Sequence, residues 1–198
     1  MKRINLTALI IAALALITAI VVPVANAGWN GAKTKTVTFD VVEDMNRFIF
    51  DKDVVFDDGM PADGSAFITR GFLYPKGTLT CDADGRCNGM HKDGTPEFPD
   101  KVVGEWVCQG YMINEAAHAK SGVWVFSTQF FQAGTKAGAQ TIVTQGYELA
   151  DVGVAIQRAI TGGTGEYGQG RGEQEQVLLG LNASEGVALR VKLDVQTR

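Results

Sequence analysis

Short runs of alternating apolar and polar residues fill the chain after residue 27. In the last run, residues 187–195, every second side chain is Val or Leu, and Arg190, Lys192 and Asp194 lie between them. A strict period of two is typical of a strand with one buried and one solvated face. Seven further β-rich runs precede it, separated by clusters of Gly, Asp and Pro, at residues 36–42, 67–74, 102–112, 122–131, 141–145, 154–160 and 171–181.

These eight runs predict an all-β fold, because no long window after residue 27 has the i, i+3, i+4, i+7 apolar spacing of a helix. Evenly spaced strands with turn signals between them are typical of a sandwich or a barrel. We expect an eight-stranded antiparallel β-barrel, since a closed barrel leaves no exposed strand edge. Residues 53–57 add a candidate short strand. The interior of a barrel of this width is either packed with side chains or holds one small ligand.

The first 27 residues have the order of parts found in a secretory signal peptide. Lys2 and Arg3 are followed by an almost unbroken apolar run at residues 9–22 and by a small-x-small site that ends at Ala27. A single membrane anchor is the alternative. We expect a signal peptide at residues 1–27 and a single β-barrel domain at residues 28–198, secreted or periplasmic, with no stable membrane insertion after cleavage.

Composition and charge narrow the class of protein. Of 198 residues, 45% are hydrophobic and 20% charged, close to the average of globular domains. The net charge of −4 offers no basic surface, so we expect no nucleic-acid partner. The two histidines, His91 and His118, lack the spacing of metal ligands. We therefore predict neither a metal site nor a cofactor.

Three cysteines in an exported chain predict one disulfide and one remaining thiol. Cys81 and Cys87 bracket a short, turn-rich loop, and their pairing is the first choice. Cys87 with Cys108 is a close alternative, although Cys108 lies in a predicted strand, where a cysteine is usually a small buried hydrophobe. Both loop cysteines belong to an Asp-, Gly- and Pro-rich stretch, residues 78–101, whose length is typical of a functional loop.

The most glycine-rich segment, residues 161–172, contains a G-x-G-x-x-G match at Gly163, Gly165 and Gly168. A dinucleotide site needs a helix N-terminus after this motif, whereas here a β-like run follows. We therefore interpret the segment as a bend or bulge between two strands, where positive φ angles are needed. A glycosylation sequon begins at Asn182 and matters only if the source glycosylates its proteins.

The segment Arg-x-x-x-Gly-Gly-Thr-Gly-x-Tyr, which begins at Arg158, resembles the signature of the dirigent and allene oxide cyclase barrel superfamily. Weaker resemblances are Val-Val-Phe-Asp-Asp at residues 54–58, Arg-Gly-Phe at 70–72, Ile-Val-Thr-Gln-Gly at 142–146 and the closing run at 187–195. Together they run through most of the chain after residue 27. The resemblance implies an eight-stranded antiparallel barrel, in agreement with the strand count.

In that superfamily the barrel holds a phenolic radical, a quinone methide or an unstable fatty-acid epoxide and controls its coupling or cyclisation. The resemblance implies a small hydrophobic or phenolic ligand and the cyclisation, isomerisation or stereoselective coupling of that ligand. It also implies Asp40, Asp151 and Arg158 as catalytic residues, with an Asp–Arg pair that faces the cavity. By the same analogy the protein is a homodimer or homotrimer.

Two other functions agree with the same sequence pattern. A lipocalin-like carrier would bind a hydrophobic ligand without chemistry, and its acids would face solvent. A structural surface protein would have a filled barrel, plugged by large side chains such as Phe39, Trp106, Trp124 and Phe126. An isomerase or cyclase, in contrast, needs inward-facing acids in an open pocket.

Overall fold

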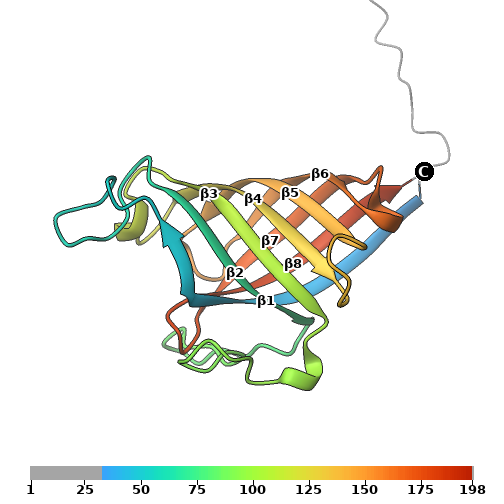
Figure 1. Ribbon diagram of the computed structural model, residues 1–198, viewed down its shortest axis with the longest axis horizontal. Helices are drawn as coiled ribbons and strands as arrows, with labels where there is room; N and C mark the ends of the chain where they lie inside the picture. Colours follow the sequence, from blue (N-terminus) through green and yellow to red (C-terminus); the bar gives the residue numbers. More distant parts are fainter. Residues whose placement is uncertain (1–32, 198) are drawn as a thin grey trace, which may run out of the picture. The chain divides into compact units, whose positions relative to one another are not determined.

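In the computed structural model, which describes residues 33–197, eight strands close into one antiparallel barrel (Figure 1). Each strand pairs with the next one along the chain, and β1 pairs with β8 to close the cylinder. The sequence-based prediction of the fold is therefore confirmed, whereas the predicted signal peptide, residues 1–27, lies outside the described residues. The strands are β1 Lys33–Phe50, β2 Ala66–Pro75, β3 Gly104–Met112, β4 Val123–Ala133, β5 Thr141–Leu149, β6 Ala155–Gly163, β7 Arg171–Leu181 and β8 Val187–Thr197.

β8 shows how the alternation in the sequence forms a wall of the barrel. Lys192 and Gln196 face solvent, whereas the apolar side chains between them are buried in the interior. Because successive side chains of a strand point to opposite faces, one face of the sheet lines the core and the other forms the outer surface. The inward residues of β8 are Val187, Leu189, Val191, Leu193 and Val195.

β1 departs most from its predicted bounds. The alternation predicted a strand at residues 36–42, whereas β1 continues to Phe50. Its register with β2 shifts between Asp44 and Ile49, where charged and polar residues interrupt the alternation. The candidate strand at 53–57 is instead part of a turn, in which Val55 forms an isolated bridge with Pro61.

One end of the barrel is filled with apolar side chains. Phe39 and Phe131 stack there with their ring centroids 6.5 Å apart. Leu73, Ile142 and Leu193 pack in the same cluster and are almost completely buried. This packing anchors the barrel and leaves the opposite end, where β1 ends and β2 begins, for the site described below.

Residues 76–103 connect β2 to β3 and lie against the outside of the barrel (Figure 1). The hydroxyl of Tyr74 donates a hydrogen bond to the carbonyl of Gly89 in this segment, at 2.8 Å. A short 3-10 helix, Pro99–Lys101, precedes β3. Outward residues of β1, β2 and β8 are therefore buried as well as inward ones. The resulting outer apolar cluster consists of Val42, Tyr74, Leu79, Cys87, Met90 and Ala188.

The disulfide in this segment joins Cys81 to Cys87, as the first choice from the sequence predicted. Cys108, on β3, is a buried free thiol. Within residues 33–197 there is no helix of the length and apolar character needed to cross a bilayer.

The glycine-rich segment connects β6 to β7 and contains a short 3-10 helix, Gly165–Tyr167, with a φ of +60° at Gly165. A Cβ on Gly163 would lie 2.3 Å from the carbonyl oxygen of Thr141, so a larger residue would force the backbone apart. The segment is thus a tight connection between two strands, as predicted, and no α-helix follows it to hold a phosphate.

Candidate functional site

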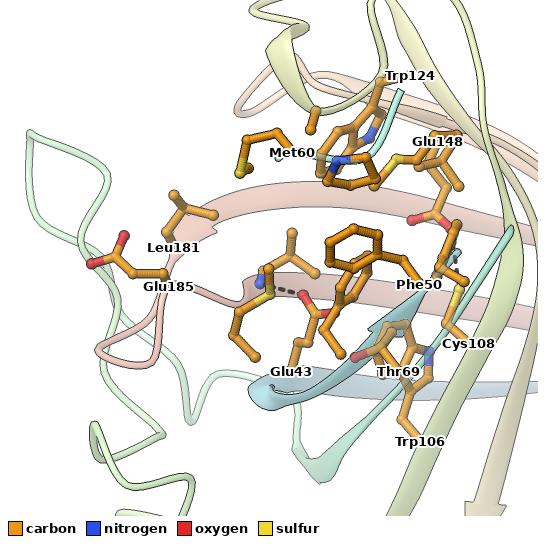
Figure 2. A pocket seen from close by; sticks show the side chains of 18 residues that line it. Glu43, Phe50, Met60, Thr69, Trp106, Cys108, Trp124, Glu148, Leu181 and Glu185 are labelled. Carbon is orange, nitrogen blue, oxygen red and sulfur yellow. Dashed lines mark hydrogen bonds between the residues drawn. The ribbon is translucent and has the colours of Figure 1, made fainter. Parts of the chain in front are cut away.

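A cavity of about 220 Å³ opens at the end of the barrel where β1 ends and β2 begins (Figure 2). Most of its wall is apolar, and two carboxyl groups, Glu43 and Glu148, are the buried acids on it. A mostly apolar cavity with a few polar groups is the usual form of a small-molecule site. Its other lining residues are Met45, Phe48, Phe50, Met60, Pro61, Phe67, Thr69, Trp106, Cys108, Met112, Ala117, Trp124, Val125, Leu181, Glu185 and Val187.

The mouth of the cavity is made by loops rather than by strands. Met60 and Pro61 come from the β1–β2 connection, and Ala117 comes from the short 3-10 helix Ala116–His118. His118 ties the two together, since its ring stacks on Phe56 at 4.0 Å between centroids and its Nε2 lies 2.9 Å from a carboxylate oxygen of Asp58. These contacts hold the β1–β2 connection over the cavity.

Glu43 is on β1, one residue before Asp44, after which the register with β2 shifts. It has the same inward parity as Phe39 and Val41, and it is 5% exposed. The backbone N–H of Val187 donates to its Oε2 at 2.8 Å. Burial is the main cause that raises the pKa of Glu43 above its usual range, because a low-dielectric environment disfavours the charged carboxylate.

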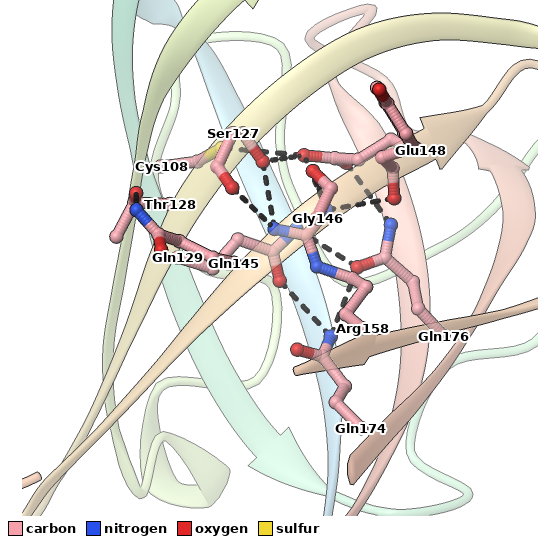
Figure 3. A network of polar contacts seen from close by, with 11 residues as sticks. Cys108, Ser127, Thr128, Gln129, Gln145, Gly146, Glu148, Arg158, Gln174 and Gln176 are labelled. Carbon is pink, nitrogen blue, oxygen red and sulfur yellow. Dashed lines mark hydrogen bonds and ion pairs between the residues drawn. The ribbon is translucent and has the colours of Figure 1, made fainter. Parts of the chain in front are cut away.

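Glu148, on β5, belongs to a buried polar network in the middle of the barrel (Figure 3). The Ser127 hydroxyl donates to its Oε1, and the side-chain amide of Gln176 donates to its Oε2 at 3.0 Å. Gln176 in turn accepts from Gln129 at 2.9 Å and from Gln174 at 3.0 Å. Both oxygens of Glu148 thus accept hydrogen bonds from side chains on β4 and β7 that do not line the cavity.

Arg158, on β6, supplies the positive charge of this network. It lies 3.6 Å from Glu148 Oε1 and donates to the carbonyl and hydroxyl oxygens of Ser127, at 3.0 and 2.9 Å. It also donates to the carbonyl oxygens of Gly146 and Tyr147, at 3.0 and 2.9 Å. A Cβ on Gly146 would lie within 3.2–3.4 Å of Arg158, so the glycine leaves room for the guanidinium stem. The two terminal nitrogens of the guanidinium are therefore held by protein oxygens, whereas its Nε is buried without a hydrogen-bond partner. Held in this way, the cation orients Glu148.

Cys108 lies between the cavity and the polar network, and its thiol donates to Glu148 Oε1 at 3.6 Å. Burial, and after it the negative charge of Glu148, raises the pKa of this thiol well above its usual range. Cys108 is therefore a neutral thiol in the cavity wall, beside the two buried carboxyl groups.

The three residues that the resemblance implied as catalytic do not come together. Arg158 faces the interior, but its acidic partner is Glu148. Asp40 is completely buried on the outer side of β1, where Arg190 and the N–H groups of the β2–β3 segment bind it. Asp151 follows β5 and accepts a hydrogen bond from the Gly122 N–H at 2.5 Å. The expected Asp–Arg pair that faces the cavity is thus replaced by a Glu–Arg pair.

Sequence reasoning missed Glu43 and Glu148, although their places in the alternation of inward and outward residues indicated that their side chains point inward. Glu43 continues the inward series of Phe39 and Val41, and Glu148 continues that of Ile142 and Thr144. Acids at inward positions of a barrel strand are costly to bury, and they therefore mark functional candidates.

Large side chains fill only part of the interior. Phe39 packs at the closed end, Trp106 and Trp124 form cavity wall, and Phe126 is 43% exposed on the outside of β4. The four residues that would plug a filled barrel therefore leave the cavity open. No group of three or more His, Cys, Asp or Glu side chains within residues 33–197 is arranged to hold a metal ion.

No protein-family model matches the chain, and no curated protein is significantly similar to it in sequence. Solved structures share its fold. The pterocarpan synthase dirigent protein PsPTS1 is 18% identical at a TM-score of 0.53, with 83% of this chain and 94% of that chain covered. The pterocarpan synthase dirigent protein GePTS1 is 14% identical at a TM-score of 0.52, with 85% of this chain and 90% of that chain covered. A pyocyanin demethylase is 18% identical at a TM-score of 0.49, with 81% of this chain and 99% of that chain covered. The chain therefore has the barrel fold of the dirigent proteins, as the resemblance in its sequence indicated.

Proposed function

We propose that this protein binds a small, mostly apolar organic molecule in the barrel cavity and steers its isomerisation or cyclisation by acid–base catalysis. The observation that carries the proposal is the placement of two buried carboxyl groups in different environments on one apolar cavity. Glu43 is desolvated, whereas Glu148 is paired with Arg158. Two titratable groups with such different surroundings are suited to opposite roles in proton transfer.

Glu43 is the acid in this proposal. Because burial raises its pKa, it keeps its proton at a higher pH than an exposed glutamate, and it donates that proton to an oxygen atom of the ligand. Glu148 is the base, and it accepts a proton from a carbon or hydroxyl of the same ligand. One proton enters and one leaves, so an isomerisation balances without any further reactant. The apolar wall excludes water and fixes the conformer that reacts.

The shared fold supports the same class of chemistry. Two proteins with this barrel are pterocarpan synthases by name, so the architecture accommodates a synthase that acts on a small organic compound. We extend this to a hydrophobic or phenolic ligand as an analogy of fold and site. Export of the chain, to the periplasm or out of the cell, belongs to the same proposal and is supported by the features of residues 1–27.

Self-association through the outer wall is part of the proposal too. Tyr111, Phe126 and Tyr147 lie in register on β3, β4 and β5, and each is about half exposed. Contiguous exposed aromatic residues on a sheet mark interaction surfaces. We therefore expect a homodimer or homotrimer that covers these three rings, to be measured by light scattering on the wild type and on the Phe126→Ser variant.

The acid–base proposal is tested with a ketone that has no role in biology. 1-Tetralone is apolar and carries exchangeable hydrogens next to its carbonyl, so an acid and a base on either side of it catalyse deuterium uptake from solvent. We expect the protein to accelerate this uptake and Glu148→Gln to lower the rate by about 100-fold or more. Glu105→Gln is the matched control, because Glu105 is an exposed acid on the same barrel.

A carrier gives a different result in the same experiment. Such a protein binds the neutral probe N-phenyl-1-naphthylamine in its cavity, but neither Glu43→Gln nor Glu148→Gln changes the rate of deuterium uptake. Absence of probe binding to the wild type contradicts both functions and leaves the structural role.

A further inference from the structure

The β7–β8 turn holds Glu43 from two sides. The N–H of Val187 donates to Glu43 Oε2 at 2.8 Å, and the side-chain amide of Asn182 donates to the Glu43 backbone carbonyl at 2.7 Å. Asn182 is fully buried, and its Oδ1 accepts from the N–H and the hydroxyl of Ser184, at 2.8 and 2.7 Å. In the folded protein the sequon asparagine is thus an internal brace, because its side-chain amide is buried and hydrogen-bonded.

The hairpin closed by the Cys81–Cys87 disulfide docks at the start of this turn. The N–H of Cys87 donates to the carbonyl of Leu181 at 2.8 Å, and the N–H of Leu181 donates to the carbonyl of Gly85 at 2.9 Å. A Cβ on Gly180 would lie 2.1 Å from the Gly85 oxygen and 3.0 Å from the Cys87 sulfur. The end of β7 is therefore shaped to receive the hairpin.

A second contact reaches the cavity itself. Arg86, between the two cysteines, donates from one nitrogen to both carboxylate oxygens of Glu185 at 2.9 Å. Glu185 and Leu181 line the cavity. The arginine and the glutamate are both largely exposed, so their ion pair contributes little by itself. The backbone contacts of the hairpin hold the turn.

We propose that the Cys81–Cys87 hairpin positions Glu43 through the β7–β8 turn, so that reduction of the disulfide by a dithiol weakens ligand binding in the cavity. The inference rests on the proposed function, because it assigns regulation to the same site. Reduction breaks the S–S bond and forms two S–H bonds with two electrons and two protons. The dithiol supplies these and becomes a disulfide itself.

The disulfide matters because the other bonds across the hairpin lie at its exposed surface, where water competes with them. Examples are the Asp82 N–H to the Arg86 carbonyl at 2.9 Å and the Arg86 N–H to an Asp82 carboxylate oxygen at 2.8 Å. Asp82, Ala83 and Asp84 are exposed, and Cys87 is the buried side chain of the hairpin, packed in the outer apolar cluster. Closing a short loop removes much of the conformational freedom of its residues. Once the loop is open, the contacts at Leu181 must order a flexible segment and are correspondingly weaker.

The experiment compares the oxidised protein with the protein reduced by dithiothreitol. Both samples carry Cys108→Ala, so that Cys81 and Cys87 are the only cysteines present. Three quantities are measured: hydrogen exchange of the Val187 amide, the pKa of Glu43 by carboxyl ¹³C NMR, and the Kd of N-phenyl-1-naphthylamine. Far-UV circular dichroism verifies that the barrel stays folded. The Arg86→Gln variant serves as a control that alters the hairpin without opening it.

On reduction we expect exchange at Val187 to become about fivefold to tenfold faster and the Kd to rise by a similar factor, as weakening of one hydrogen bond predicts. Weakening the Val187 hydrogen bond by itself raises the pKa of Glu43, because that bond stabilises the carboxylate, whereas water admitted by a looser turn lowers it. Burial is the larger cause, so we expect the net shift of this pKa to be downward, toward its usual range. A merely structural disulfide would leave this pKa unchanged. Arg86→Gln changes none of the three by more than about twofold.

The outcomes separate the two proposals. Unchanged exchange at Val187 together with an unchanged pKa of Glu43 overturns the role of the hairpin, whatever the probe does. Lack of probe binding to the oxidised protein overturns the proposed function, while the exchange and pKa measurements still decide on the hairpin. The Cys81→Ser/Cys87→Ser variant repeats the reduced state without reductant, and we expect it to match the reduced protein in all three quantities.

Discussion

Arg158 on β6 and Glu148 on the neighbouring strand β5 lie 3.6 Å apart inside the barrel, with both side chains buried. The guanidinium also binds three backbone carbonyls on β4 and β5. One residue of β6 therefore joins the proposed base to the wall of the barrel, and its loss affects both function and stability.

Replacement of Arg158 by Met leaves Glu148 with an uncompensated charge and removes the donor that Arg158 supplies to three carbonyls. We expect a loss of about 3–5 kcal/mol in the free energy of unfolding, measured in urea. The Arg158→Met/Glu148→Gln variant should be more stable than Arg158→Met, because the buried charge is gone. Lys192→Met breaks an exposed ion pair with Asp194 and is expected to change stability little. Equal losses in the single and double variants would show that the two side chains are not coupled.

Asp40→Asn tests the residue that the family resemblance implied as catalytic. Asp40 accepts hydrogen bonds from Arg190, Gly77 and Leu79, so the variant should unfold about 2 kcal/mol more easily. Limited proteolysis should cut within residues 76–103 faster in this variant than in the wild type. Arg190→Gln, which removes the partner of Asp40, should have the same two effects. The rate of deuterium uptake into 1-tetralone should stay that of the wild type. A fall in that rate without a fall in stability would return Asp40 to the catalytic site.

Glu43 makes stability depend on pH in a specific direction. Because the pKa of Glu43 is raised in the folded state, the folded protein holds this proton more tightly than the unfolded chain. The stability is fully present below the unfolded pKa and is lost as pH rises through the folded pKa. Glu43→Gln removes this dependence. The difference in the free energy of unfolding between the variant and the wild type should therefore grow in favour of the variant as pH rises, by about 1.4 kcal/mol per unit of raised pKa. Urea denaturation of both proteins from pH 4 to 9 measures this difference. A free energy of unfolding that depends on pH in the same way in both would contradict the burial of this acid.

Val125→Phe places extra volume in the cavity. Val125 is a buried wall residue, so the added ring overlaps the space of a ligand. We expect the Kd of N-phenyl-1-naphthylamine to rise by at least about tenfold, since such an overlap costs a ligand more than ~1.4 kcal/mol. The melting temperature should change little, because the ring enters open space. Val107→Phe, on the outer side of β3, is the control, and equal binding by both variants would place the probe elsewhere.

The sequence predicted the number of strands and the closed barrel because the alternation survives in most strands. It could not predict which face Asp40 takes, since the β2–β3 segment buries the outer side of β1 and makes both faces apolar around Asp40 and Val42. Arg158 was found from its motif. Its partner Glu148 was not, because their contact depends on the cross-strand arrangement of β5 and β6 and on the space beside Gly146.

Because side chains fill the barrel at one end and leave a cavity at the other, the two ends differ in how they tolerate redesign. Around the rings of Phe39 and Phe131, a change in one side chain calls for changes in its neighbours. At the opposite end, the wall comes largely from strand ends and connecting loops, with Met60 and Leu181 among the more exposed residues. New ligand specificity can therefore be selected by varying the rim, while the packed end preserves the scaffold.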